Sequence, residues 1–186
     1  PAEGTVSREV RLATVADVDV AVQAAKAAFP AWADSSLAKR QTVLFAFREL
    51  LNARKSEVAA ILTNEHGKVT SDALGEVARG LEVVEFATSI PHLMKGEYSE
   101  NVSTGVDVYS LHQPLGVVGI ISPFNFPAMV PLWFFPIAIA AGNTIVLKPA
   151  EITPLTSLML AEDCIAAGIP AGVVNVVTGT GPVAGE

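Results

Sequence analysis

The sequence predicts an α/β fold in which a helical arm and an antiparallel hairpin accompany an incomplete, Rossmann-like parallel sheet. Apolar strands rich in Val and Ile alternate with helical segments between residues 114 and 186. Polar residues follow two of these strands directly, at Ser122–Asn125 and at Lys148–Glu151. In the first half, apolar residues recur at three- and four-residue spacing. Ligands of open parallel sheets bind at the carboxyl ends of the strands, so these polar residues are the first candidates for a site.

The first helix follows a turn and a short strand that we expect within residues 1–13. Thr14–Asp17 has the spacing of a capping box, with Asp in place of the usual Glu. The apolar residues that follow lie on one helical face, and Pro30 is expected to end the helix. That face consists of Val18, Val22, Ala25 and Phe29.

Two further amphipathic helices complete the predicted arm. One begins after Ser35 or Ser36 and runs, broken or continuous, to Gly67, a typical helix stop. The next begins near Thr70 and is expected to end at Pro91. Their apolar stripes are Val43, Leu44, Phe47, Leu50 and Leu51 in the first, and Leu74, Val77, Leu81 and Val84 in the second.

Residues 97–113 change character, because Val, Leu and Tyr alternate there with polar residues and Gly105 can form a turn. This pattern predicts one or two exposed antiparallel strands, most simply a hairpin. An isolated hairpin is only marginally stable in water, so we expect it to pair with another chain or with a segment outside this one. The sequence thus divides into helices at 1–97, hairpin strands at 98–113 and the sheet at 114–186.

The last part reads as strand, helix, strand, helix and strand, which is half of a Rossmann-like sheet. A glycine series then leads into a further helix at the end of the chain. The elements are the strand Val117–Ile121, the helix Ala128–Ala141, the strand Thr144–Leu147, a helix from Pro154 to about Ala167, and the strand Val173–Val177.

Composition excludes several classes of function. The net charge is −7, with 19 acidic and 12 basic residues and no basic cluster, so nucleic-acid binding lacks its electrostatic footprint. The uncharged stretch between Asp107 and Lys148 is divided by prolines and glycines into pieces too short to span a membrane. One cysteine excludes an internal disulfide framework, and with no signal-peptide pattern we expect a cytoplasmic protein.

Three polar motifs each allow two interpretations. Gly179, Gly181 and Gly185 follow a strand and precede a helix, but their spacing departs by one residue from a dinucleotide-binding fingerprint, so an ordinary turn fits equally. Lys148 and Glu151 could bond ribose hydroxyls, or could form a solvated loop in which Glu151 is a helix N-terminal charge. Asn125, between prolines and aromatic rings, could donate to an oxyanion or cap the next helix.

Other reactive side chains fit structural roles better. Cys164 lies within a helix with no histidine near it in sequence, which favours a buried structural thiol. The three histidines, His66, His92 and His112, show no metal-ligand spacing, and no metal site is expected. Arg79 lies between Glu76 and Glu82, where a surface ion pair is the simplest role.

Taken together, these motifs resemble the aldehyde dehydrogenase superfamily from about Gly4 to Glu186. Within it, three segments are most similar to methylmalonate-semialdehyde dehydrogenase: Ser122–Pro127, Met129–Pro136 and Gly75–Ala87. The resemblance to the wider superfamily is carried by Pro114–Gly119, Pro123–Pro127, Gly142–Glu151, Thr153–Leu155 and Gly168–Gly179.

The resemblance implies an enzyme that uses NAD, and coenzyme A as co-substrate, to convert a small semialdehyde to acetyl- or propionyl-CoA through a cysteine thioester. It also implies a homo-oligomer, dimer or tetramer, with a role in valine or inositol catabolism. The roles it assigns are an oxyanion hole for Asn125, cofactor contacts for Ile121, Ser122, Pro123 and Phe124, adenosine-ribose contacts for Lys148 and Glu151, a turn near adenosine and pyrophosphate for Gly181 and Gly185, and substrate-carboxylate binding for Arg79.

The chain also departs from the family pattern. Ile152 stands where a basic residue is common, and Cys164 does not match the position of the nucleophile. The resemblance places that nucleophile beyond Glu186, so we expect this chain by itself not to turn over an aldehyde. Two alternatives stay open: another NAD(P)-dependent aldehyde dehydrogenase that acts by hydrolysis, and a non-catalytic module that binds nucleotide or another subunit.

Overall fold

The parallel sheet has three strands in the order β3–β4–β5, as seen in a computed structural model that describes residues 4–6 and 8–185. The strands are β3 (Val117–Ile121), β4 (Thr144–Lys148) and β5 (Val174–Val176), and the helices α5 (Met129–Ala140) and α6 (Leu155–Ala166) connect them. Both strand pairs are parallel, which confirms the predicted half of a Rossmann-like sheet. β4, in the centre, is buried along almost its whole length.

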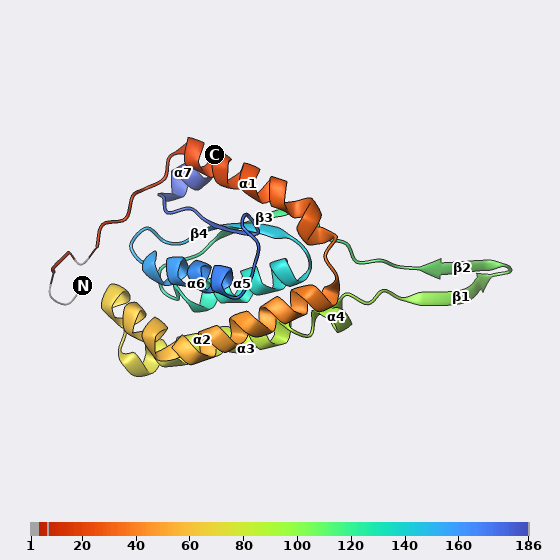
Figure 1. The fold of residues 1–186 in the computed structure, drawn as a ribbon, viewed down its shortest axis with the longest axis horizontal. Helices are drawn as coiled ribbons and strands as arrows, with labels where there is room; N and C mark the ends of the chain where they lie inside the picture. The colour runs from red at the N-terminus through yellow and green to blue at the C-terminus, as the bar shows by residue number, and fades with distance from the viewer. Residues whose placement is uncertain (1–3, 7, 186) are drawn as a thin grey trace.

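The predicted helices exist but separate into different layers (Figure 1). α1 (Val15–Ala33) lies against one face of the sheet, next to the short α7 (Gly181–Gly185). α5 and α6 cover the other face, and α2 (Leu37–His66) and α3 (Thr70–Ala87) pack on the far side of α5 and α6. α4 (Ile90–Leu93) is a single turn after α3. The main core therefore lies between α2, α3 and the crossover helices, where Phe47 and Phe135 meet edge to face at 5.6 Å.

The predicted boundaries of α1 are confirmed at its start and wrong at its end. Thr14 and Asp17 form the capping box, with the Thr14 backbone N–H donating to Asp17 Oδ2 at 2.8 Å. Pro30 lies inside the helix, which continues to Ala33. A proline so close to a helix end removes only one donor, and the last turn is held by the buried Trp32, whose indole N–H donates to the Ile139 carbonyl at 2.9 Å.

Other local predictions at the helices also need correction. A short strand was expected within residues 1–13, but none forms in residues 4–6 and 8–13. Residues 1–3 and 7 lie outside the described part of the chain. α3 ends at Ala87, where the Thr88 hydroxyl turns back onto the Glu85 carbonyl. Pro91 instead lies in the first turn of α4. Pro154 precedes α6 rather than occupying its first position.

α2 is continuous from its Ser36 cap to Gly67, whose left-handed φ of 85° confirms it as the helix stop. One of its residues, the buried Arg40, donates to the Ala140 carbonyl at the end of α5 at 2.9 Å. A guanidinium at a helix C-terminus complements the negative end of the helix dipole. The outer helices are therefore bonded to the ends of α5 as well as packed against its side.

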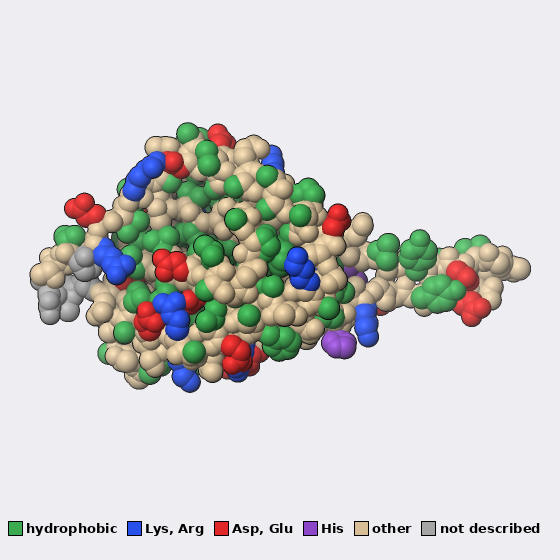
Figure 2. All heavy atoms as spheres, in the orientation of Figure 1, with side chains coloured by type: hydrophobic (Ala, Val, Ile, Leu, Met, Phe, Trp, Pro, Cys, Tyr) green, Lys and Arg blue, Asp and Glu red, His purple; other side chains and the backbone are tan. Residues whose placement is uncertain are grey.

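The hairpin is confirmed and projects from the rest of the molecule (Figure 1). β1 (Tyr98–Ser103) pairs antiparallel with β2 (Val106–Tyr109), and Gly105 adopts a left-handed φ of 73° in the turn. Every residue of both strands is exposed. Figure 2 shows hydrophobic side chains standing on this projecting arm. Such exposure is unusual for strands, and it is the observation behind the predicted pairing with another chain, which stays a prediction.

Candidate functional site

Two of the predicted site segments meet at the carboxyl edge of the sheet. In the parallel register Ile121 lies opposite Lys148, so β3 and β4 end together. The Ser122 backbone N–H then donates to the Lys148 carbonyl at 3.0 Å, which extends the pairing by one step. The segment leading to Asn125 and the segment leading to Glu151 therefore leave the sheet side by side. This is the arrangement that the sequence predicted for a ligand site.

Lys148 and Glu151 form an ion pair at this edge. Lys148 Nζ lies 3.0 Å from Glu151 Oε2, with Lys148 only 6% exposed and Glu151 exposed to solvent. The backbone amide of Glu151 and the Lys148 ammonium both lower the pKa of the Glu151 carboxyl. The pair therefore offers an anionic acceptor and a cationic donor next to each other, a combination that suits vicinal hydroxyls.

A hollow of about 230 Å³ adjoins the pair, between the sheet, α1 and α7. The ends of β3 and β4 contribute Ile121 and Lys148 to it, and its remaining walls are apolar except for backbone. Apolar walls with a few polar groups at one end are typical of the lining of small-molecule sites. The apolar lining residues are Val18, Val22, Ile120, Val146, Val177 and Ala184.

Ser122 adds a buried hydroxyl to this edge of the sheet. It is 3% exposed, and its hydroxyl has no hydrogen-bond partner among the described residues. The buried hydroxyls of Thr63, Thr153, Thr156 and Ser157 also lack a partner among the described residues, so it is the place of Ser122, directly after β3, that makes its hydroxyl a candidate to bond a ligand. Phe124, two residues on, is exposed and stacks on His66 with ring centroids 6.5 Å apart.

Asn125 does not cap the next helix. The first amides of α5, Ala128 N and Met129 N, donate instead to Glu76 Oε1 at 2.8 and 3.1 Å. Asn125 is exposed, and its amide makes no hydrogen bond among the described residues. The capping alternative is therefore wrong, and the side chain is left with its donor for another partner.

Glu76 belongs to a buried ion pair that the sequence analysis missed. Its side chain is 1% exposed, and Glu76 Oε2 lies 2.5 Å from Lys68 Nζ. Lys68 Nζ also donates to the Asn125 carbonyl at 3.0 Å and lies 4.3 Å from the centre of the Phe126 ring. One lysine and one glutamate thus contact the segment on both sides of Phe126.

A different choice of helical face would have revealed Glu76. The predicted stripe of α3 contained Leu74, which is exposed. The buried face of α3 is rotated by one position from the predicted one. It includes the charged Glu76, which lies between the buried apolar residues Ala73 and Val77 on that face. That face consists of Ala73, Glu76, Val77, Gly80, Val84 and Ala87.

Glu65 occupies the start of α6 in the same way. Glu65 Oε1 accepts from the Leu155 backbone N–H at 2.9 Å, and α6 has no side-chain cap of its own. Burial raises the pKa of Glu65, while the backbone amides of Leu155 and Thr156 act in the opposite direction. The idea that Glu151 is the N-terminal charge of α6 is therefore not borne out. Both crossover helices have their positive ends filled by carboxylates from α2 and α3.

The remaining predicted site residues lie apart from these contacts. Arg79 is exposed on α3 and pairs with Glu82, and no described contact joins it to Asn125. Gly181 and Gly185 begin and end α7, so the expected helix forms within the glycine series and not after it. A Cβ at either glycine would meet nothing within 4 Å, so packing does not require glycine there. The roles assigned to these three residues stay predictions.

Cys164 is a buried structural thiol, as expected. It is 1% exposed, and burial raises the pKa of its thiol well above the usual value. A neutral, buried thiol is a poor nucleophile. Among the residues that the structure describes, no three His, Cys, Asp or Glu side chains gather to hold a metal ion. No described helix is long and apolar enough to cross a membrane.

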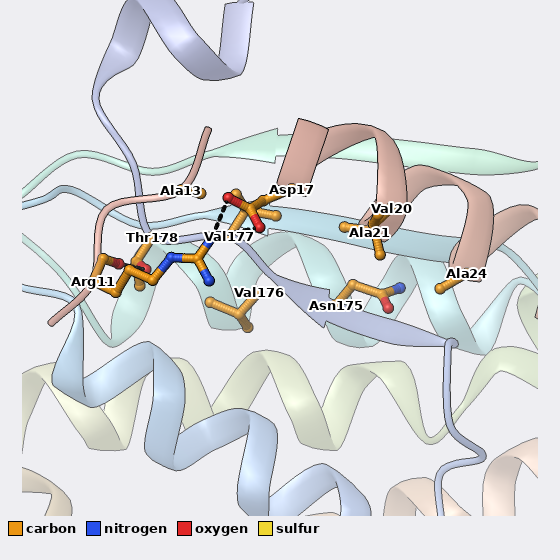
Figure 3. A pocket seen from close by; sticks show the side chains of 10 residues that line it. All are labelled: Arg11, Ala13, Asp17, Val20, Ala21, Ala24, Asn175, Val176, Val177 and Thr178. Carbon is orange, nitrogen blue, oxygen red and sulfur yellow. Dashed lines mark hydrogen bonds and ion pairs between the residues drawn. The ribbon is translucent and has the colours of Figure 1, made fainter. Parts of the chain in front are cut away.

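A second hollow lies elsewhere, along β5 and α1 (Figure 3). It measures about 390 Å³, and its charged groups are Arg11 and Asp17, which pair with each other at 2.6 Å. Asn175 on its floor donates to two backbone carbonyls, those of Ile145 and Gly172. Its polar groups are thus already satisfied, unlike Ser122 and Asn125 at the carboxyl edge.

Comparison with known proteins agrees with this geometry. The model of the aldehyde dehydrogenase family matches residues 1–186. Malonate-semialdehyde dehydrogenase of Pseudomonas aeruginosa is 49% identical over 179 residues, 96% of this chain and 36% of that protein. The mitochondrial, acylating methylmalonate-semialdehyde dehydrogenase of Arabidopsis thaliana is 48% identical over 180 residues, 97% of this chain and 30% of that protein.

A solved structure shows the same similarity in three dimensions. The crystal structure of a Sinorhizobium meliloti 1021 protein complexed with NAD superimposes with a TM-score of 0.94 at 49% identity, covering 97% of this chain and 37% of that one. The chain therefore spans about a third of the length of the relatives it matches.

Proposed function

The chain belongs to the aldehyde dehydrogenase family, and we propose that it forms the cofactor-binding part of an NAD-dependent, acylating malonate- or methylmalonate-semialdehyde dehydrogenase. The observation that carries the proposal is the convergence of Ser122, Asn125 and the Lys148–Glu151 pair at one edge of the sheet. The similarity to relatives that act on these two semialdehydes supplies the substrate class.

The residues at this edge fit NAD. The Lys148–Glu151 pair would hold the hydroxyls of the adenosine ribose, and the unpartnered Ser122 hydroxyl is available to the cofactor where it passes the end of β3. Ile121, Pro123 and Phe124 would line that passage, with Gly181 and Gly185 of α7 near the pyrophosphate. The exposed Glu151 carboxylate would repel a 2′-phosphate, which favours NAD over NADP. When bound, NAD accepts the hydride that leaves the substrate.

Asn125 is proposed as the oxyanion donor. Its backbone is held by neighbouring contacts while its amide has no other partner among the described residues. A fixed donor of this kind lowers the energy of a negative charge that develops on the carbonyl oxygen of the substrate. Arg79 would bind the carboxylate of the semialdehyde, for which a guanidinium is well suited.

We also infer that the chain alone does not turn over an aldehyde. Its one cysteine, Cys164, is buried in α6 with a raised pKa and is no candidate for the nucleophile. Thioester formation, and transfer of the acyl group to coenzyme A, would need a thiol from sequence outside these residues.

The assay that tests the proposal measures NADH and acyl-CoA together. A reading frame that contains this chain and a catalytic cysteine should reduce NAD with methylmalonate or malonate semialdehyde, release CO2 and form propionyl- or acetyl-CoA. The 186-residue chain should form neither. NADH formation that proceeds equally without coenzyme A would favour the hydrolytic alternative, and an active preparation that forms no acyl-CoA would refute the acylating assignment.

The hairpin is the proposed contact with a second copy of the chain. Both strands expose apolar side chains, which a partner strand or surface would cover, giving a dimer or tetramer. Sedimentation with and without NAD tests this and separates it from a non-catalytic nucleotide-binding role. A folded monomer without affinity for NAD would exclude both.

A further inference from the structure

We propose that the buried Lys68–Glu76 ion pair is a positioning device that fixes the backbone around Asn125 while leaving the amide of Asn125 available to a ligand. Neither residue is assigned this role by the similarity to other enzymes. The inference rests on four contacts from the pair to residues 125–129 and on the ion pair itself.

The two ions hold the segment from its C-terminal side. Glu76 Oε1 accepts from Ala128 N and Met129 N at 2.8 and 3.1 Å, and so closes the first turn of α5. Glu76 Oε2 holds Lys68 at 2.5 Å. Lys68 reaches back to the Asn125 carbonyl at 3.0 Å. The Asn125 carbonyl and the Ala128 and Met129 amides are therefore all bonded to one pair of side chains.

The segment is held from its other side by the sheet. Ser122 N donates to the Lys148 carbonyl at 3.0 Å, so the backbone three residues before Asn125 is fixed to β4. The Phe126 ring is fixed by the Lys68 ammonium, which lies 4.3 Å from its centre. Asn125 thus lies between two backbone positions that are held by hydrogen bonds or ring contacts, Ser122 and Phe126. Its side-chain amide takes part in neither contact.

Stability alone does not explain an ion pair in this place. The Lys68 and Glu76 side chains are only 12% and 1% exposed, so both charges are largely removed from water. Burying such a pair costs desolvation that its attraction only roughly offsets, and apolar residues often serve a core as well. A charged pair provides geometric specificity, because each ion donates or accepts several hydrogen bonds in defined directions. Here those bonds end on the backbone around Asn125.

If the pair positions Asn125, the melting temperature of the full 186-residue chain and the backbone order at Asn125 should respond differently to substitutions in the pair. Lys68→Met leaves Glu76 buried without its cation, so both the melting temperature and the order around Asn125 should fall. The double variant Lys68→Met/Glu76→Gln carries no unpaired charge, and Gln can still accept from the start of α5. Its melting temperature should recover toward that of the wild type, whereas Asn125 should stay mobile because nothing holds its carbonyl.

The measurement is ¹⁵N relaxation at Asn125 and Phe126, with amide exchange at Ala128 and Met129 and thermal melts on the same samples. Wild type should give backbone order parameters of about 0.85 at Asn125, and the double variant values below about 0.6. Lys55→Met and Glu82→Gln, exposed on α2 and α3, are the matched controls and should change neither readout.

Two results would overturn the proposal. One is an Asn125 that regains wild-type order in the double variant along with the melting temperature, which would make the pair merely structural. The other is an Asn125 that is already mobile in the wild type. The catalytic meaning of the placement rests on the proposed function, but these measurements need neither aldehyde nor NAD. A failure of the enzyme assay and a failure of the positioning role are therefore distinguishable.

Discussion

The start of α1 and the starts of α5 and α6 solve the same problem in different ways. Each helix begins with backbone N–H groups that lack a partner within the helix. α1 uses its own residues, Thr14 and Asp17, in an exposed capping box. α5 and α6 have no side-chain cap of their own and receive carboxylates from other helices, Glu76 and Glu65.

The difference teaches what each kind of cap can do. A local cap stabilises one helix and could be lost without disturbing its neighbours. A carboxylate from α2 or α3 ties the outer helices to the crossover helices, and it sits at the edge of the sheet where the site lies. The carboxylate also occupies the positive N-terminal end of α5 or α6, so neither helix start is free to bind an anionic ligand.

The largest effect should come from Glu76→Ala. The substitution leaves Lys68 buried without its anion and two amides of α5 without their acceptor, and removing one member of a buried pair typically costs about 3–5 kcal/mol. The free energy of unfolding from denaturant titration is the measurement. Glu82→Ala, in the exposed pair with Arg79 on the same helix, should change it by less than about 1 kcal/mol. If Glu76→Ala and Glu82→Ala lowered the free energy of unfolding equally, the buried carboxylate would be no more important for stability than the exposed one, which would contradict this account.

Packing of α3 against α5 is tested by two glycines of α3. A Cβ at Gly80 would lie 2.4 Å from Leu132 Cδ1 and 3.1 Å from Leu132 Cβ, whereas one at Gly75 would meet nothing within 4 Å. Leu132 is fully buried and has no room to move away. Gly80→Val should therefore lower the free energy of unfolding by roughly 1–3 kcal/mol. Gly75→Val should leave it nearly unchanged, and a comparable loss there would show that α3 is not held as described.

Glu65→Ala removes the acceptor at the start of α6 and should destabilise the chain by about 1–2 kcal/mol, the usual cost of a lost helix cap. Because burial raises the pKa of Glu65 above 4.5 in the folded chain, the folded state binds the proton more tightly than the unfolded state. The contribution of Glu65 is therefore greatest below pH 4.5 and declines as the pH rises above it. Melting temperatures of wild type and variant across this range check the sign.

Asp17→Asn should have the smallest effect and the opposite pH dependence. The Thr14 backbone amide and hydroxyl, then Arg11, lower the pKa of Asp17 from 3.8 to about 2. Its contribution is therefore present above pH 3.8 and is lost as the pH falls toward 2. Melting curves of wild type and variant should differ at neutral pH and coincide near pH 2. A difference that grows on acidification would contradict the assignment of this cap as a local, charge-dependent one.

The same contrast explains what the sequence could predict. The capping box, the Gly67 stop and the hairpin depend on neighbouring residues, and their patterns are visible in a short window. The caps of α5 and α6 join residues 52 and 90 positions apart, so no window contains both partners. The prediction that Pro30 ends α1 was wrong because proline disrupts a helix mainly in its interior. Here the last turn, after Pro30, is held by the buried Trp32.

The candidate site follows the same division. Lys148 and Glu151 are three residues apart at the end of a recognisable strand, and Asn125 stands directly after another, so their meeting at one edge was predictable. Lys68 and Glu76 belong to a helix connection and a helix face that look like ordinary surface in sequence. Only the fold brings them against Asn125.

The central claim is that the edge formed by Ser122, Asn125, Lys148 and Glu151 binds NAD, and calorimetric titration of the chain with NAD tests it most directly. The wild type should bind one NAD and bind NADP more weakly. Glu151→Gln should weaken NAD by roughly tenfold, as expected when a charged acceptor of a hydroxyl is lost, and should narrow the difference from NADP. Glu162→Gln, exposed on α6, is the matched control and should bind as the wild type does. A folded chain that gives no heat with NAD, or a Glu151→Gln variant that binds NAD and NADP as the wild type does, would contradict the account.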